Sequence, residues 1–294
     1  MMVTAPTLSI EAARTGRRRK FTNWAMTALL TATMAATIAV LLWVLGYVAA
    51  EGLKYLGPEF LTQTPPGNPA QPGGGFVNGI IGSIIIVGIA TVLSIPIGLA
   101  AAIYFVEYGG RLARYARFVT DVMVGIPTIV TGAFVYAVWV VHFGFSGIAG
   151  GIALALIMLP LIIRSVEEML RLVPNEIREA SLALGVTRAR TIVAVVLPTA
   201  SSGIITGIML AVARAMGETA PLLLTALGND LFTELNPDKR MSTLSLQIFG
   251  NAITGFKAAQ ARAWAGALTL VALVLLFTLA ARLIARRSTI SQGR

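Results

Sequence analysis

Six long apolar runs divide this chain, and they constrain its fold more than any other feature of the sequence. A helix needs about 20 apolar residues to cross the hydrocarbon core of a bilayer. A spanning helix also satisfies its own backbone hydrogen bonds, which an open strand in lipid does not. The sequence therefore predicts an all-α polytopic membrane protein with six transmembrane helices, at residues 24–50, 77–106, 118–141, 148–163, 201–227 and 264–284.

Composition agrees with burial in lipid. Only 12% of the residues are charged and 56% are hydrophobic, whereas a soluble domain carries about 25% charged residues. The net charge of +10 does not indicate nucleic-acid binding, because the cations stand in short clusters between the apolar runs. Most of them lie in the N-terminal tail, in the segments after the second and fourth runs, and in the C-terminal tail. Since Lys and Arg stay cytoplasmic, we predict that both termini are inside.

The runs and the charges predict a domain order. We expect a cytoplasmic basic tail at 1–23, an uncleaved first transmembrane helix at 24–50, and an external Pro/Gly-rich loop at 51–76. A permease-like core at 77–284 follows, with a cytoplasmic segment at 172–198, and then a tail at 285–294. The glycines at 73–75 precede no Gly-Lys-Ser/Thr sequence, so they are interpreted as flexible loop and not as a phosphate cradle. Pro96 predicts a kink in the second helix, and Gly125-Ile126-Pro127 predicts a break in the third run.

The cytoplasmic segment 172–198 is predicted to form two short helices. Pro174 should stop the fourth helix, and Asn175 is expected to cap a new one. Gly185 should end it, since glycine tolerates a left-handed cap. A second short helix is expected at 186–197, before Pro198.

This segment resembles the EAA loop of ABC-importer permeases. The matching residues keep the spacing of that family, with Val195 where the family usually has Ile; they are Glu179, Ala180, Ser181, Gly185, Leu197 and Pro198. The resemblance implies a six-helix type I importer permease whose coupling helix docks into a separate ATPase subunit. The other interpretation is a solvated amphipathic connector.

Arg214 and Glu218 stand in the middle of the fifth apolar run. A charge at the bilayer centre costs at least about 2.5–3.5 kcal/mol by insertion scales. Their spacing of four places both on one face of a helix, where they can pair. Either the pair fixes helix packing, or Arg214 binds an anion on a central pathway, a role that suits its planar fork.

The residues around this pair resemble the A-type permease subunit of the phosphate-specific transport family. The strongest match is RAMGETAPLLLTA at 214–226, supported by matches at 102–108, 125–130 and 159–170. The resemblance implies a phosphate pathway through Arg214, Glu218, the neighbouring Thr219, and Arg164. From the residues alone, Arg164 is either a pathway residue or a cation that snorkels to the cytoplasmic surface. Glu167 and Glu168 are interpreted as helix-end charges.

This sequence lacks the residues that several kinds of chemistry require. It has no cysteine and one histidine, so no metal site, cofactor or catalytic residue is predicted. It has no Gly-x4-Gly-Lys-Ser/Thr sequence, so ATP hydrolysis is assigned to a partner chain.

The function predicted is a permease subunit of an ATP-driven phosphate importer in the bacterial inner membrane. The expected partners are a second similar permease, a cytoplasmic ATPase dimer, an external phosphate-binding protein and membrane lipid, without nucleic acid. The alternatives are a permease for molybdate, sulfate or an amino acid, a membrane-embedded enzyme that uses Arg214 and Glu218, and a passive channel.

Overall fold

The computed structural model describes residues 10–290, with side chains placed at 16–283. Over these residues the chain is helical, with a single isolated bridge and no strand, which confirms the predicted all-α class. The outermost parts of the two predicted tails, 1–9 and 291–294, lie outside the described residues. The chain forms two compact units, which meet between Ala50 and Glu51.

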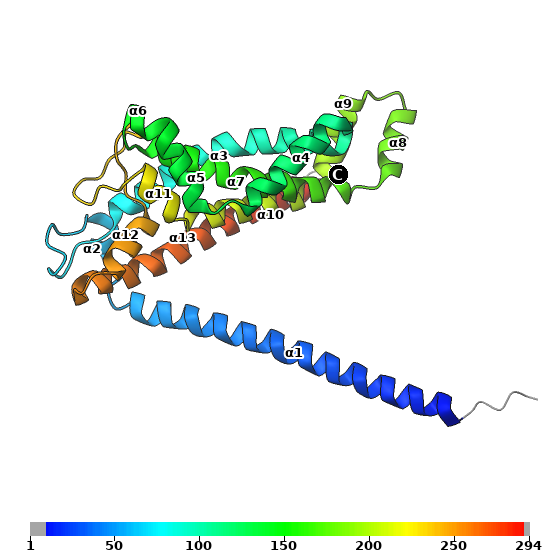
Figure 1. The fold of residues 1–294 in the computed structure, drawn as a ribbon, viewed down its shortest axis with the longest axis horizontal. Coiled ribbons are helices and arrows are strands. Elements are labelled where there is room, and N and C mark those ends of the chain that lie inside the picture. Colours follow the sequence, from blue (N-terminus) through cyan, green and yellow to red (C-terminus); the bar gives the residue numbers. More distant parts are fainter. Residues whose placement is uncertain (1–9, 291–294) are drawn as a thin grey trace, which may run out of the picture. The chain divides into compact units, whose positions relative to one another are not determined.

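Most of the helices follow one another with short connections, and longer loops stand at 63–76 and 226–243 (Figure 1). Those of the first half are α1 (Ile10–Gly52), α2 (Pro58–Thr62), α3 (Val77–Ile103), the π-helical η1 (Tyr104–Tyr108), α4 (Gly110–Gly125), α5 (Thr128–Val135), the π-helical η2 (Tyr136–Val140) and α6 (Val141–Phe143). Those of the second half are α7 (Gly147–Arg171), α8 (Asn175–Ala183), α9 (Arg188–Thr191), the π-helical η3 (Ile192–Val196), α10 (Leu197–Met216), α11 (Ala220–Thr225), α12 (Leu244–Ala252) and α13 (Lys257–Ile290).

The first unit is built on α1, whose sequence is apolar on all sides between its basic start and residue 50. Some of its hydroxyl groups bond within the helix: Thr31 and Thr37 each donate to the carbonyl oxygen four residues earlier, at 2.8 and 2.9 Å. A helix that is apolar all round is suited to a lipid environment.

The membrane spans agree with the sequence in number and differ in detail. Among the described residues, five helices are long and apolar enough to cross a membrane, or six when the bent pair 110–125 and 128–143 counts as one span. The fourth span is longer than its apolar run, because α7 continues past Arg164 to Arg171. The fifth run is not one helix, which corrects the prediction for 201–227.

The third run is broken where proline predicts it. Helix α4 ends at Gly125, and α5 begins at Thr128 after a bend of 105°. Ile126 is extended, with φ −74° and ψ 127°, because a residue that precedes proline is disfavoured in the helical region. Pro96 is different, since α3 continues through it as one helix.

Helix α7 is the centre of the second unit. It packs along α3 on one side and α10 on the other, and the main core joins these three helices with α11. Glycines stand at both contacts, Gly98 and Gly151 between α3 and α7, and Gly203 and Gly207 between α7 and α10. A Cβ on any of them would overlap a side chain of the facing helix. Small residues allow such close approach of membrane helices.

The outer loop is irregular, as predicted, but its backbone is held in place. Arg262 of α13 is 4% exposed, and its guanidinium donates to the carbonyl oxygens of Gln71 at 2.7 Å and Pro69 at 2.9 Å. Behind the loop, the rings of Phe60 and Phe76 are 5.2 Å apart. These contacts tie the irregular backbone of this segment to α13.

The cytoplasmic segment differs from the prediction in two ways. Helix α8 does begin at Asn175, but its cap residue is Pro174, which has no side-chain hydrogen bond to offer. Gly185 follows α8 with φ +79°, as the helix-ending role requires. The expected separate helix at 186–197 is wrong, because α9, η3 and α10 run on as one helical span from Arg188 to Met216.

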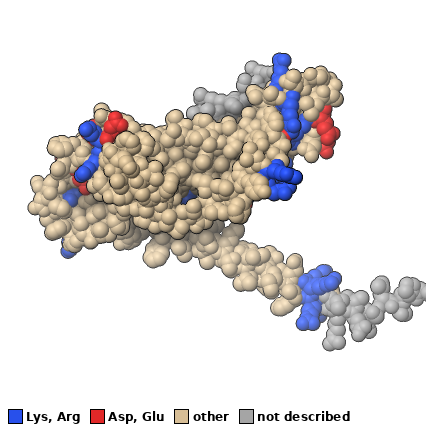
Figure 2. Space-filling view, turned by 45° about the horizontal axis from the view of Figure 1, so that its top comes forward, with Lys and Arg blue, Asp and Glu red and all other residues tan. Residues whose placement is uncertain are grey.

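Charges gather at the two ends of the second unit. Figure 1 shows α8 and α9 at one end of this unit, and α2, α6 and α12 at the opposite end. On the face shown in Figure 2, Lys, Arg, Asp and Glu lie near these ends, and a broad band between them is largely uncharged. This distribution is the one expected of a protein whose middle lies in hydrocarbon.

Candidate substrate site and coupling segment

The fifth apolar run is interrupted at the residues that the sequence singled out. Helix α10 ends at Met216, Gly217 follows as its cap, and α11 begins at Ala220 with Pro221 in its first turn. Glycine after one helix and proline at the start of the next is the usual asymmetry of helix ends. Arg214 therefore lies in the last turn of α10, and Glu218 lies in the connection beyond it.

The two charged side chains face each other across this break. Nε of Arg214 lies 3.7 Å from Oε1 of Glu218, and the Glu218 side chain is 16% exposed. That distance is an ion pair but exceeds hydrogen-bond length. Within the described chain, Arg214 has no hydrogen bond, so its five N–H donors are uncommitted. The pairing predicted from the spacing of four is confirmed, although no continuous helix carries it.

The connection is held by a residue far along the chain. Ser245 of α12 is 4% exposed, and its hydroxyl donates to the carbonyl oxygen of Glu218 at 2.8 Å. This bond satisfies a carbonyl that no longer belongs to a helix. The sequence does not single out Ser245, because it is one of several polar residues close together, with Ser242, Thr243 and Gln247. Thr219 follows Glu218 half-buried, and its hydroxyl makes no hydrogen bond within the described residues.

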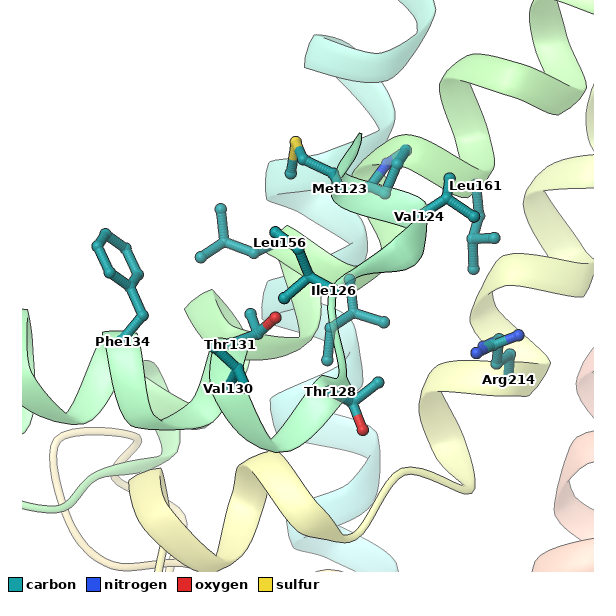
Figure 3. A pocket seen from close by; sticks show the side chains of 12 residues that line it. Met123, Val124, Ile126, Thr128, Val130, Thr131, Phe134, Leu156, Leu161 and Arg214 are labelled. Atoms are coloured by element: carbon teal, nitrogen blue, oxygen red, sulfur yellow. The ribbon is translucent and has the colours of Figure 1, made fainter. Parts of the chain in front are cut away.

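Arg214 lines a cavity of about 400 Å³ between the bent third span and helices α7 and α10. Figure 3 shows Arg214 on α10 across this space from Ile126 and Thr128, which lie at the bend between α4 and α5. Apart from Arg214, the polar side chains of the lining are Thr128 and Thr131. The remaining lining residues are apolar and include Met123, Phe134 and Leu161. Arg214 is the only charged group in the lining, so a negative ligand in this space has one dominant electrostatic partner.

Arg164 is paired as well. Its guanidinium contacts the carboxylate of Asp121 in α4, and the two side chains are 44% and 41% exposed. Arg164 lies one helical turn beyond Pro160 and Leu161, which line the Arg214 cavity. Asp121 was not a predicted site residue. Each candidate pathway cation thus has a carboxylate partner in its own chain.

Glu167 is not the simple helix-end charge expected of it. Its side chain is 5% exposed, and Oε1 accepts from both Arg117 of α4 and Arg171 of α7, at 2.8 and 2.7 Å. A buried carboxylate requires such partners. Glu168 remains exposed.

The predicted coupling residues fall into two groups. Glu179 and Ala180 are exposed on α8, whereas Leu197 and Pro198 lie at the start of α10, with Leu197 packed against the core. Ser181 is buried, and its hydroxyl lies 2.9 Å from that of Thr191. That hydroxyl links α8 to α9 and does not face outward.

The packing of α5 against α11 yields a prediction at Gly132. A Cβ at this position would lie 2.6 Å from Cα of Pro221, which is backbone and cannot rotate away. We expect Gly132→Ala to destabilise the protein by about 1–3 kcal/mol, as overpacking does, and to displace α11. Thermal unfolding of the purified protein measures this loss. Gly88→Ala is the control, because no atom lies within 4 Å of its added Cβ; equal melting temperatures for the two variants would contradict the packing.

Comparison with known proteins agrees with the fold and the site. A family model described as "Binding-protein-dependent transport system inner membrane component" matches residues 94–290. Among solved structures, a permease chain of a bacterial alginate ABC transporter covers 92% of this chain and 97% of its own, with a TM-score of 0.66 at 14% identity. A chain of the methionine transporter MetNI covers 72% of this chain and 95% of its own, with a TM-score of 0.59 at 22% identity. At such identities these structures establish the fold alone.

The chain belongs to the family of binding-protein-dependent transport system inner membrane components. Two similar curated relatives are the phosphate transport system permease protein PstA of Yersinia pestis and PstA 1 of Mycobacterium tuberculosis. The first is 43% identical and covers 86% of each chain; the second is 39% identical and covers 91% of this chain and 90% of its own. The inner-membrane location and the transport role predicted from the sequence are confirmed, and the enzyme hypothesis is set aside.

Proposed function

We propose that this chain is the A-type permease subunit of an ATP-driven importer of inorganic phosphate. The observation that carries the proposal is Arg214, a cation with uncommitted donors that lines an apolar cavity at a helix break. The relatives at 39–43% identity are named for phosphate transport, and they favour phosphate over molybdate, sulfate or an amino acid.

In this proposal the Glu218 carboxylate neutralises Arg214 while the site is empty. An arriving phosphate competes for the guanidinium, whose fork matches two oxyanion oxygens at once. Because Glu218 stays close, the anion is repelled as well as attracted, and binding remains weak enough for release. Arg164 of α7, which is paired with Asp121, offers the anion a second guanidinium with a neighbouring carboxylate. Thr219 offers a hydroxyl group beside Glu218.

A second permease subunit completes the pathway. The Arg214 side chain is 59% exposed in the single chain, and exposure of a cation to lipid at this depth is costly. Another protein surface or a water-filled passage must therefore cover it. One guanidinium also does not balance a doubly charged phosphate, so we propose that a similar permease supplies further positive charge. Lipid surrounds the remaining apolar faces.

The energy comes from outside this chain, which has no nucleotide-binding loop. We propose that a cytoplasmic ATPase dimer binds α8 at the exposed residues Glu179 and Ala180, and that Gly185, Leu197 and Pro198 fix the path of the segment. An external phosphate-binding protein delivers the substrate to the opposite end. ATP binding and hydrolysis then alternate access between the two sides.

The test is reconstitution of the complex in lipid vesicles with its ATPase and its external binding protein. We expect the phosphate-loaded binding protein to stimulate ATP hydrolysis and to drive phosphate uptake. Excess molybdate or sulfate should not reduce this uptake. Stimulation by sulfate or molybdate in the absence of phosphate would overturn the cargo assignment, and uptake without ATP would favour the passive channel.

A further inference from the structure

One arginine side chain of α8, Arg178, has partners in two other transmembrane spans, in addition to the contacts of α8 with the start of the fifth span. Arg178 is 14% exposed, and its Nε lies 3.1 Å from Oε1 of Glu107 at the end of the α3 span. Its Nη2 donates to the carbonyl oxygen of Leu170 at 2.8 Å, and its Nη1 donates to that of Val173. The guanidinium thus contacts the ends of two transmembrane helices at once. The packing contacts of α8 itself are with α9 and η3.

The partner carboxylate depends on this contact. Glu107 lies in η1 with its side chain 7% exposed, and Arg178 is the only cation that pairs with it among the described residues. Removal of one member of a buried pair leaves the other charge uncompensated. The contact is therefore maintained while the helices move, or it breaks at a large cost.

A second set of contacts continues from η1 to the wall of the Arg214 cavity. Arg117 of α4 donates to the carbonyl oxygen of Phe105 in η1 at 3.3 Å, and its guanidinium carbon lies 5.2 Å from the centre of the Phe105 ring. The same side chain pairs with the buried Glu167 of α7. Helix α4 goes on to Met123 and Val124, which line the cavity. Side-chain contacts therefore connect α8 to η1 and η1 to α4, and the backbones of η1 and α4 complete the connection to the cavity.

We propose that the Arg178–Glu107 ion pair transmits movement of α8 to η1 and, through Arg117, to the α4 wall of the Arg214 cavity. Both members are positioning residues, since neither lies at the cavity. The inference rests on the proposed function, because it assigns α8 as the element that the ATPase moves. A contact between α8 and η1 transmits movement only when the two elements shift together. A guanidinium that is hydrogen-bonded on several sides holds them together more firmly than an apolar contact does.

The test compares Arg178→Gln, Glu107→Gln and the double variant in the reconstituted complex. The quantity measured is the amount of phosphate transported per ATP hydrolysed. A general loss of stability lowers transport and hydrolysis together, whereas loss of transmission lowers their ratio. We expect each single variant to retain hydrolysis and to lose at least about tenfold in the ratio, since each leaves a buried charge unpaired. The double variant should be no worse than the poorer single variant, because both substitutions remove one contact.

The controls separate this inference from the proposed function. Arg114→Gln removes an exposed α4 cation that has no bond within the described chain, and it should transport as the unmodified complex does. Arg178→Lys keeps the charge without the three-way contact. It should assemble and transport an intermediate amount of phosphate per ATP hydrolysed. If Arg178→Gln does not assemble, Arg178→Lys takes its place in the comparison. Unchanged ratios in the single variants, or losses that multiply in the double variant, would overturn the inference. Failure of the unmodified complex to transport phosphate would count against the proposed function instead.

The absence of cysteine allows a second measurement. A fluorophore on Val119→Cys, an exposed position of α4, should change its emission when ATP binds to the assembled complex. We expect Arg178→Gln and Arg178→Lys to reduce this change, and Arg114→Gln to preserve it. An undiminished response in both Arg178 variants would show that α4 follows the ATPase by another route and would refute the proposal.

Discussion

Arg214→Gln is expected to lower phosphate uptake by about 10- to 100-fold, because a hydrogen-bonded charged group contributes about 1.5–3 kcal/mol and each 1.4 kcal/mol is tenfold. Glutamine is shorter and uncharged, so this substitution removes both the charge and the guanidinium fork. Phosphate uptake by Arg214→Lys should lie between that of the unmodified subunit and that of Arg214→Gln, since an ammonium keeps the charge but does not match two oxygens at once. Uptake of labelled phosphate by cells that contain equal amounts of the subunit measures the effect.

Glu218→Gln should have a different signature from the Arg214 variants. Without the competing carboxylate, phosphate is held more tightly by Arg214, so KM should fall while the maximal rate also falls because release is slower. Near-normal uptake in Arg214→Gln, Arg214→Lys and Glu218→Gln together would end the proposal that this pair binds the substrate.

Gly185→Val is expected to abolish uptake and to reduce the amount of ATPase that co-purifies with the subunit. Gly185 has φ +79°, and this conformation costs an L-residue about 1–2 kcal/mol even without branching. A β-branched side chain there should redirect the chain between α8 and α9, so that Glu179 and Ala180 no longer present the same surface.

Gly185→Asn is the matched variant, since asparagine enters the left-handed region more readily than other residues. It should retain most of the uptake and of the bound ATPase. No Cβ clash is expected at this position, because nothing lies within 4 Å of it, so the comparison isolates the backbone conformation. Equal losses in the two variants would indicate that the side chain, and not the left-handed turn, matters there.

The sequence predicted the spans well because their length is set by the bilayer and not by tertiary contacts. It also predicted the bend at Ile126-Pro127, since proline restricts its neighbour locally. The break at Gly217 was missed because the apolar run continues through it, although Gly217 and Pro221 together are a recognisable signal. In that case, hydropathy was given more weight than helix-end chemistry.

The ion pairs at the α8 end of the second unit were not predictable in the same way. Arg178 and Glu107 are 71 residues apart, and Arg117 and Glu167 are 50 apart. No local spacing links such residues, and burial of each carboxylate becomes apparent only when the helices are packed. Arg214 and Glu218 were found because both lie within one turn of the same apolar run.

The hydrogen bonds that Arg262 makes to the loop at 63–76 have a consequence for the proposed binding of a delivery protein. Fixing the backbone of a free residue costs about 1–2 kcal/mol in conformational entropy, and here that ordering took place when the subunit folded, because the guanidinium already holds the carbonyl oxygens of Pro69 and Gln71. Under the proposed function, a delivery protein that binds this loop does not have to order its backbone, so the arginine contact favours the assembly of the two proteins.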